Sequence, residues 1–166
     1  GINSKNKIKN IISDILISSI FFEIKNNSIT KETSVSMFKL SQDKTPVFLM
    51  NPLSKDLSVM RSNMFFNGLE TIKYNLNRQI NNLKLFEFGK TYALHKKKYL
   101  EDEKITFFSC GVFKGGNWSE QVVNTDFFLM KGVLDKLINR FLPASFRFSL
   151  QEINEDYAEY GLSYSF

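Results

Sequence analysis

Residues 47–94 decide the fold of this chain, and they read VFLMNPLSKDLSVMRSNMFFNGLETIKYNLNRQINNLKLFEFGKTYAL. The apolar residues 47–50 predict a strand that ends at Pro52, because proline has no amide hydrogen to donate to a sheet. Residues 84–94 predict a second strand. Residues 65–80 predict a helix whose apolar face comprises Phe65, Leu69, Ile72, Leu76 and Ile80. The segment contains no usual catalytic cluster, so we expect it to form the framework of the domain.

Two more helices are predicted, one on each side of this segment. Residues 4–19 predict a helix with an apolar stripe of Ile8, Ile11, Ile12, Ile15 and Leu16. This stripe could face the sheet of the same domain or a partner helix. The other helix should begin at Thr125 or Asp126, whose side chains can cap it, and end near Phe141.

The remaining strands are expected at residues 21–24, 105–114, 145–153 and 162–166. Residues 105–114 are apolar almost throughout, which indicates a strand covered on both faces. Residues 96–103 carry charges of both signs and predict a solvated loop at a hairpin tip. Adjacent strands between few helices favour an α+β fold with a mostly antiparallel sheet.

The composition describes a globular domain and excludes several kinds of site. The chain has 166 residues with 43% hydrophobic residues and 17 Phe, which suffices for one domain with a sizeable core. The net charge of +5 permits contact with nucleic acid or an acidic protein, although a solvated lysine-rich surface is the simpler explanation. The single Cys110 is expected in the core, and His95 is the only histidine, so we predict no zinc site. No apolar run approaches the roughly 20 residues of a membrane span, and we expect a cytoplasmic protein.

The order of four short motifs resembles the β subunit of bacterial phenylalanyl-tRNA synthetase. The motifs are NPLS at residues 51–54, MRS at 60–62, NLNR at 75–78 and LFEFG at 85–89. Residues 125–132, TDFFLMKG, are similar to the start of a helix in the same family, whereas Ile20 replaces a usual glycine. The resemblance implies a class II aminoacyl-tRNA synthetase-like sheet flanked by helices. It also implies that residues 1–166 form one catalytic-like domain of a larger β subunit.

The same resemblance bears on catalysis. Class II enzymes hold the α-phosphate of ATP with an arginine in a Phe-Arg-x-Glu motif, because negative charge develops there in the transition state. The aligned residues are 92–95, where Ala93 takes the arginine position and His95 the glutamate position. An alanine cannot hold a phosphate oxygen. We therefore expect this domain to contain no catalytic residue and to bind no cofactor, with ATP and Mg²⁺ used elsewhere in the holoenzyme.

The partner implied by the resemblance is the α subunit of an α2β2 heterotetramer, which charges tRNA(Phe) with phenylalanine. Contacts within this assembly are predicted at Ile8, Ile11, Ile12, Ile15, Asn51, Pro52, Ser54, Arg61 and Ser62. Arg61 could be a buried guanidinium that pairs with a carboxylate of the α subunit or orders the loop from Asn51, or an exposed residue before a helix. Glu87 could be a solvated strand residue or a buried partner for Arg61.

Two alternatives stay open. The domain could be an active ATP-dependent ligase with a substituted site. It could also bind tRNA directly through residues 96–98 and the lysines near the N-terminus, and binding would then depend steeply on salt.

Overall fold

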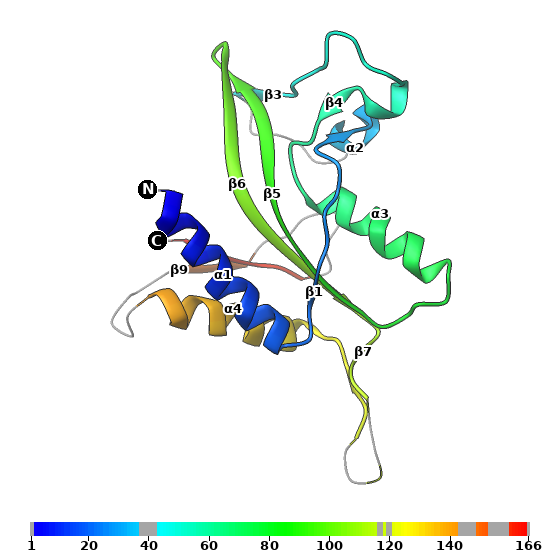
Figure 1. Cartoon of the computed structure of the whole chain (residues 1–166), viewed down its shortest axis with the longest axis vertical. Coiled ribbons are helices and arrows are strands. Elements are labelled where there is room, and N and C mark those ends of the chain that lie inside the picture. Colours follow the sequence, from blue (N-terminus) through cyan, green and yellow to red (C-terminus); the bar gives the residue numbers. More distant parts are fainter. Residues whose placement is uncertain are drawn as a thin grey trace.

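A long antiparallel hairpin forms the centre of the computed structural model, which describes residues 2–36, 43–115, 118, 121–142, 149–152 and 160–165. Strand β5 (Leu83–His95) pairs along its whole length with β6 (Lys98–Cys110). The other edge of β5 pairs in parallel with β1 (Phe22–Glu23) and antiparallel with β3 (Lys44–Thr45). Figure 1 shows this hairpin running through the molecule. The mostly antiparallel sheet with helices against it confirms the predicted α+β fold.

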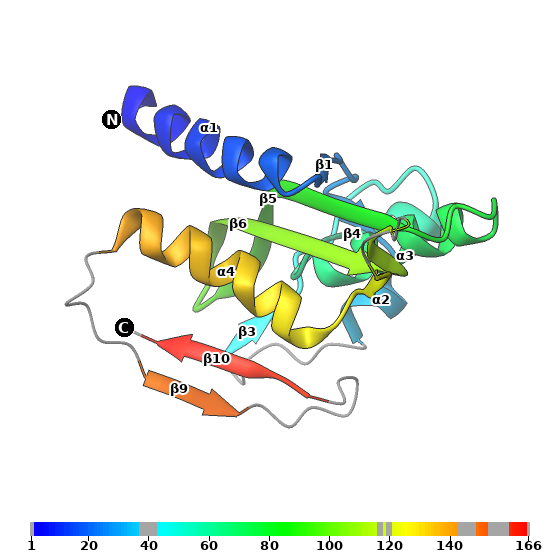
Figure 2. The ribbon, with the colours of Figure 1, turned by 90° about the horizontal axis from the view of Figure 1, so that it is seen from below.

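Helices α1 (Ile2–Ser18) and α4 (Phe127–Phe141) lie together against one face of the hairpin (Figures 1 and 2). The buried core between them consists of Leu16, Phe21, Phe86, Val133 and Leu137. Complete burial of a large apolar side chain contributes roughly 1.5–3 kcal/mol, so this aromatic and aliphatic layer fixes both helices to the sheet. The predicted cap is confirmed, because Asp126 Oδ1 accepts a hydrogen bond of 2.7 Å from the amide of Leu129.

The opposite face of the hairpin is covered by α3 (Phe65–Leu76) and by the pair β2 (Ile29–Thr30) and β4 (Val59–Met60). Successive strand residues point to opposite faces, so Phe107 joins the core under α1 while Phe108 packs against Phe65 of α3. The hairpin is therefore the middle layer of a three-layer arrangement.

Six short elements complete the described chain, and they lie at the periphery. They are α2 (Glu32–Ser36), the 3-10 helix η1 (Lys55–Leu57), β7 (Val112–Lys114), β8 (Val123–Asn124), β9 (Ser149–Glu152) and β10 (Leu162–Ser165). Strands β7 and β8 form one antiparallel pair, and β9 and β10 form another. Residues 145–148, 153 and 166, for which we predicted parts of strands, lie outside the described residues.

Two predictions about the strands are wrong. Residues 47–50 form no strand, since only Phe48 makes a single bridge to Val59, and Pro46 and Pro52 remove amide donors on both sides. Residues 98–103 belong to β6 rather than to a loop, and the hairpin turn is only Lys96 and Lys97.

The strand predicted at residues 105–114 is also different from the observed one. It breaks at Gly111, whose φ of +74° suits glycine and whose absent Cβ would lie 2.2 Å from the Asn81 carbonyl oxygen. Only Phe108 is buried within β6, and Cys110 is half-buried instead of lying in the core. The strand is therefore covered on both faces only around Phe107 and Phe108, and its first half is largely exposed.

Helix α3 presents a different face to the sheet from the one predicted. Leu69 and Leu76 are each 42% exposed and Ile80 is 47% exposed, whereas Asn67 and Gly68 are buried. The cause is the close approach of Phe108, since a Cβ on Gly68 would lie only 2.0 Å from its ring. The glycine, rather than the apolar stripe, decides which side of α3 packs.

This packing predicts opposite effects for two helical glycines. Gly68→Ala should lower the free energy of unfolding by about 1–3 kcal/mol, because the new methyl group would overlap the Phe108 ring. Gly132→Ala in α4 is the matched control, since nothing lies within 4 Å of its absent Cβ. It should raise stability by up to about 1 kcal/mol through helix propensity. Urea denaturation of both variants measures the difference, and equal effects would contradict the packing described for α3.

Candidate functional site

A buried ion pair joins Arg61, directly after β4, to Glu87 in the middle of β5. Arg61 Nη1 lies 2.9 Å from Glu87 Oε1, and both side chains are 1% exposed. Arg61 Nε donates a second hydrogen bond of 2.9 Å to the carbonyl oxygen of Lys90. The arginine backbone is also held, because its amide donates to the Ser28 carbonyl and its carbonyl accepts from the Tyr92 amide, each at 2.9 Å. Arg61 is thus fixed by both its side chain and its main chain.

Both oxygens of the Glu87 carboxylate accept hydrogen bonds from neighbouring residues. Oε1 also accepts a hydrogen bond of 3.2 Å from the Asn26 amide, and Oε2 accepts one of 2.9 Å from Asn26 Nδ2. Asn26 Oδ1 in turn accepts a hydrogen bond of 2.8 Å from the Thr71 hydroxyl of α3. A buried carboxylate is tolerated when it is paired and its lone pairs are satisfied. The network therefore connects four separate segments of the chain at one point on the sheet.

Gly89 makes room for the guanidinium. A Cβ at this position would lie 2.1 Å from Arg61 Nη2 and 2.7 Å from Met64 Cε. Arg61 therefore lies directly against the backbone of β5, and Met64 covers the same point. Nη2 and the Ser62 hydroxyl have no hydrogen-bond partner among the described residues. This part of the sheet face is occupied by the chain's own side chains.

Ala93 and His95 lie further along the same face of β5. Ala93 is 8% exposed and opposite Leu100, and His95 Nδ1 is 3.0 Å from the Asp43 carbonyl oxygen. Strand alternation places Glu87 and Gly89 on the face that also carries Ala93. Arg61 is the arginine described on this face, and its charge is already paired with Glu87. Lys44 and Lys98, opposite His95, lie further along toward the hairpin turn.

The predicted contact residues are spread over several environments. Asn51, Pro52 and Ser54 are exposed, whereas Ser62 is half-buried. In α1, Ile12 and Ile15 pack against the core under the helix, Ile11 is half-buried, and Ile8 is 46% exposed. The stripe is therefore shared between the domain's own sheet and its surface. The carboxylate that pairs with Arg61 is Glu87 of this chain, and the assignment of these residues to a subunit contact stays a prediction.

A cavity of about 420 Å³ lies beside the buried network. Asn26, Asn67 and Thr71 line it, together with the Glu70 carboxylate and the Tyr74 ring. Asn67 is 7% exposed and its Oδ1 has no hydrogen-bond partner among the described residues. The sequence contains a sign of this polar lining, since Asn67 and Thr71 lie four positions apart within α3 and so share one face of the helix. The apolar stripe of the same helix is the more prominent pattern and conceals this polar one.

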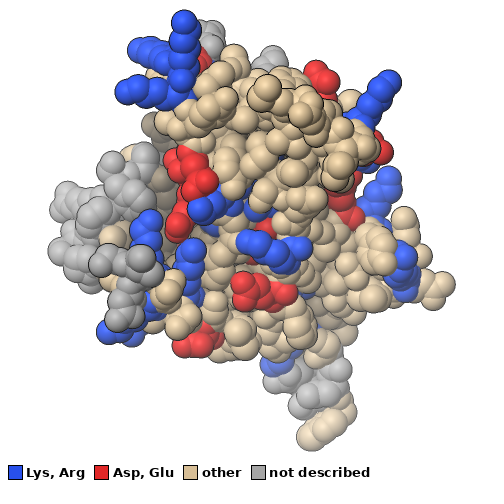
Figure 3. Space-filling view, turned by 45° about the horizontal axis from the view of Figure 1, so that its top comes forward, with Lys and Arg blue, Asp and Glu red and all other residues tan. Residues whose placement is uncertain are grey.

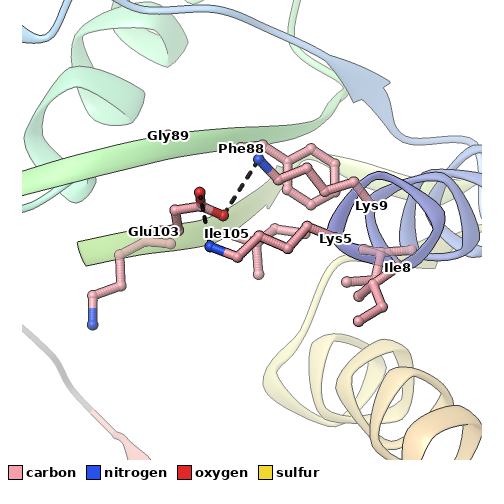
Figure 4. Close-up of a pocket in the computed structure, with 9 residues that line it drawn as sticks. Lys5, Ile8, Lys9, Phe88, Gly89, Glu103 and Ile105 are labelled. Carbon is pink, nitrogen blue, oxygen red and sulfur yellow. Dashed lines mark ion pairs between the residues drawn. The ribbon is translucent and has the colours of Figure 1, made fainter. Parts of the chain in front are cut away.

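A second pocket, of about 270 Å³, lies between α1 and the hairpin (Figure 4). Lys5 and Lys9 point from α1 toward Glu103 of β6, at 3.6 and 3.4 Å from its oxygens. Ile8 and Phe88 are part of the apolar lining. The charge of Lys5, and to a smaller extent that of Lys9, lowers the pKa of Glu103 below its ordinary value of 4.5. The first turns of α1 are therefore held to β6 partly by charge.

Among the described residues, no group of three or more His, Cys, Asp or Glu side chains could hold a metal ion. No helix in the described part of the chain is long and apolar enough to cross a membrane.

The ion pair should behave as a unit in a double-mutant cycle. Arg61→Met or Glu87→Leu alone should each lower the free energy of unfolding by about 3–5 kcal/mol, because a buried charge would be left unpaired. The double variant should cost less than either single change. Denaturant unfolding of the four proteins measures the coupling, and additive losses would show that the two groups do not stabilise each other.

The Glu103 contact should depend on pH. Because its pKa is lowered in the folded chain, this carboxylate stabilises the fold above its ordinary pKa of 4.5. The contribution should be lost as the pH falls through the lowered value. A titration of the Glu103 carboxyl carbon by NMR should give a pKa below the ordinary one, and Lys5→Gln with Lys9→Gln should restore it. An unchanged pKa in that double variant would mean that the lysines are not the cause.

Comparison with known proteins agrees with this architecture. The sequence model described as "Phenylalanyl tRNA synthetase beta chain CLM domain" matches residues 1–159. The β subunit of phenylalanine–tRNA ligase from Porphyromonas gingivalis is 32% identical over 159 residues, which cover 90% of this chain and 19% of that protein. The corresponding subunit of Thermotoga maritima is 31% identical over 140 residues, 84% of this chain and 18% of that protein. The chain thus spans about a fifth of the length of these relatives.

Two solved structures share the fold. A pyrrolysyl-tRNA synthetase from Desulfitobacterium hafniense matches with a TM-score of 0.59 and 14% identity, over 90% of this chain and 48% of that one. An ATP phosphoribosyltransferase regulatory subunit/histidyl-tRNA synthetase from Bacillus halodurans matches with a TM-score of 0.60 and 14% identity, over 89% and 37% of the two chains. The fold is therefore of the class II tRNA synthetase type. With the family model covering nearly all of its residues, the chain belongs to the family of the phenylalanyl-tRNA synthetase β-chain CLM domain.

Proposed function

We propose that this chain is a non-catalytic, catalytic-like module of a phenylalanine–tRNA ligase β subunit that pairs with the α subunit. The holoenzyme would be an α2β2 heterotetramer that attaches phenylalanine to tRNA(Phe) with ATP and Mg²⁺. The observation that carries the proposal is the state of the sheet face around Ala93. A class II site needs a free arginine at this position to hold the α-phosphate of ATP, whereas this chain has only the methyl group of Ala93.

Arg61, the arginine on this face in the described part of the chain, is poorly suited to replace it. Arg61 donates to Glu87 and to the carbonyl of Lys90, and a carboxylate that already neutralises a guanidinium leaves little charge for a phosphate. Its side chain and Met64 also fill the space over Gly89. A nucleotide at this point would have to displace both side chains and leave Glu87 buried without its cation. These features support a structural role for the module, with ATP and Mg²⁺ used by the α subunit.

The surface of α1 supports a role in assembly. Its buried side is anchored by Leu16, which is 0% exposed, so the helix has a fixed orientation. Ile8, which is 46% exposed, and the half-buried Ile11 form an apolar patch next to the buried side of the helix. A partner helix could cover this patch without disturbing the core. The exposed residues Asn51, Pro52 and Ser54 would add a second contact at the other end of the domain.

Substitutions in α1 test the pairing. Ile8→Asp or Ile11→Asp should prevent co-purification with the α subunit, because a carboxylate would be buried in the contact without a partner. Asn10→Asp, an exposed change in the same helix, is the matched control and should assemble normally. Ile15→Asp should instead unfold the domain, since this side chain packs on the core. Normal assembly of both Ile8→Asp and Ile11→Asp would contradict the contact.

Calorimetric titration with ATP and Mg²⁺ gives a separate readout, in which micromolar binding by the chain alone would contradict the non-catalytic role.

A further inference from the structure

The turn between β5 and β6 has a backbone that lysine does not favour. Lys96 has a φ of +46° and Lys97 a φ of +64°, so both residues of this two-residue turn lie in the left-handed region. Turns of this kind favour Asn-Gly, because a Cβ is strained at positive φ. The backbone alone therefore gives no reason for two lysines at this place.

Positive charge is concentrated around this turn. Lys44 and Lys98 each lie opposite His95 in the sheet register, next to Lys96 and Lys97. Residues 44 and 95–98 are called the basic tip below. In Figure 3, basic side chains (Lys and Arg, blue) gather at the upper edge of the molecule. No described carboxylate oxygen lies within 4.0 Å of these four lysine nitrogens. Other lysines in the described chain do form such pairs, namely Lys5, Lys9, Lys31, Lys90 and Lys131.

An exposed aromatic ring adjoins the basic tip. Tyr99 follows Lys98 directly, lies opposite Leu94 on β5, and is 77% exposed. Strand alternation turns it to the face opposite that of Lys98, so charge and ring lie on two sides of one narrow hairpin end. Figure 1 shows this end of the hairpin rising past α1 and α4. The tip can therefore be reached by a large partner without a clash with the helices.

We propose that the basic tip binds RNA, with its lysines on backbone phosphates and the Tyr99 ring stacked on an unpaired base. Lysine is a flexible point charge that contacts phosphates without a demanding geometry. An aromatic side chain beside basic residues is typical of proteins that hold unpaired nucleotides. An acidic peptide would use the lysines but would leave the ring without a function. The choice of RNA among polyanions rests on the proposed function, in which the holoenzyme acts on tRNA.

The turn geometry supplies a clean variant. Lys96→Asn combined with Lys97→Gly removes two charges and installs the residues that this turn prefers, so thermal stability should stay equal or rise. Lys73→Gln with Lys136→Gln removes the same charge from exposed positions on α3 and α4 and is the matched control. Tyr99→Ser tests the ring alone. Each variant is studied as the full chain in complex with the α subunit and also by itself, with circular dichroism to confirm the fold.

Fluorescence anisotropy with a labelled tRNA(Phe) transcript, from 50 to about 200 mM salt, measures the contact. The turn variant should weaken binding by about tenfold or more at low salt and reduce the slope of log K against log salt by about 2. Tyr99→Ser should weaken binding by roughly tenfold with an unchanged slope. The control pair should leave both quantities unchanged.

Three outcomes would overturn the inference. They are equal affinity of the turn variant and the unaltered chain, an equal loss in the control pair, and unchanged RNA affinity of Tyr99→Ser together with a loss of poly-glutamate binding by the turn variant. The last result would identify an acidic protein as the partner. Co-purification with the α subunit is read separately, so a failure of assembly tells against the proposed function and an unaltered RNA affinity tells against the basic tip.

Discussion

The ion pair between Arg61 and Glu87 is the interaction on which this domain depends. It forms where the chain after β4 crosses β5, and it extends through Asn26 to Thr71 of α3. Two buried opposite charges are costly to remove from water, and they persist only where geometry and further hydrogen bonds compensate. Here Glu87 accepts from two residues, and Arg61 also donates to a main-chain carbonyl. The position of α3 and of the loop before it follows from these contacts.

The two faces of the hairpin are built on different principles. Under α1 and α4 the contacts are aromatic and aliphatic, with Phe21, Phe86 and Phe107 near the centre. Under α3 the apolar residues Leu85 and Phe108 lie beside the buried polar residues Glu87 and Thr91, and the covering layer supplies an arginine and an asparagine. The middle of this second face is thus filled by polar side chains of the chain itself.

Much of the architecture could be predicted from the sequence, because the helices and the central strand depend on patterns among residues close together in the chain. The α1 stripe, the Asp126 cap and the alternation in β5 each follow from spacing or from one side chain's hydrogen bond. The family resemblance gave the fold type. What could not be predicted depends on contacts between distant residues. The packed side of α3 is set by Gly68 against Phe108, forty positions away, and Glu87 looks like a surface residue until Arg61 is placed over Gly89. At Lys96 the sequence predicts a long loop instead of a tight turn, because it lacks the usual Asn-Gly.

The parallel pairing of β1 with β5 has a consequence for how the chain reaches this structure. The hairpin brings together residues that are near in sequence at its turn and then closes progressively. In contrast, Asn26 and Glu87 are separated by 61 positions and Arg61 and Glu87 by 26. Closing long loops carries an entropic cost that must be met before the contacts form. The hairpin is therefore the natural nucleus of folding, and the buried charges meet late. An ion pair that forms late in folding affects the rate of unfolding more than the rate of folding. Loss of the Arg61–Glu87 pair should therefore mainly speed up unfolding.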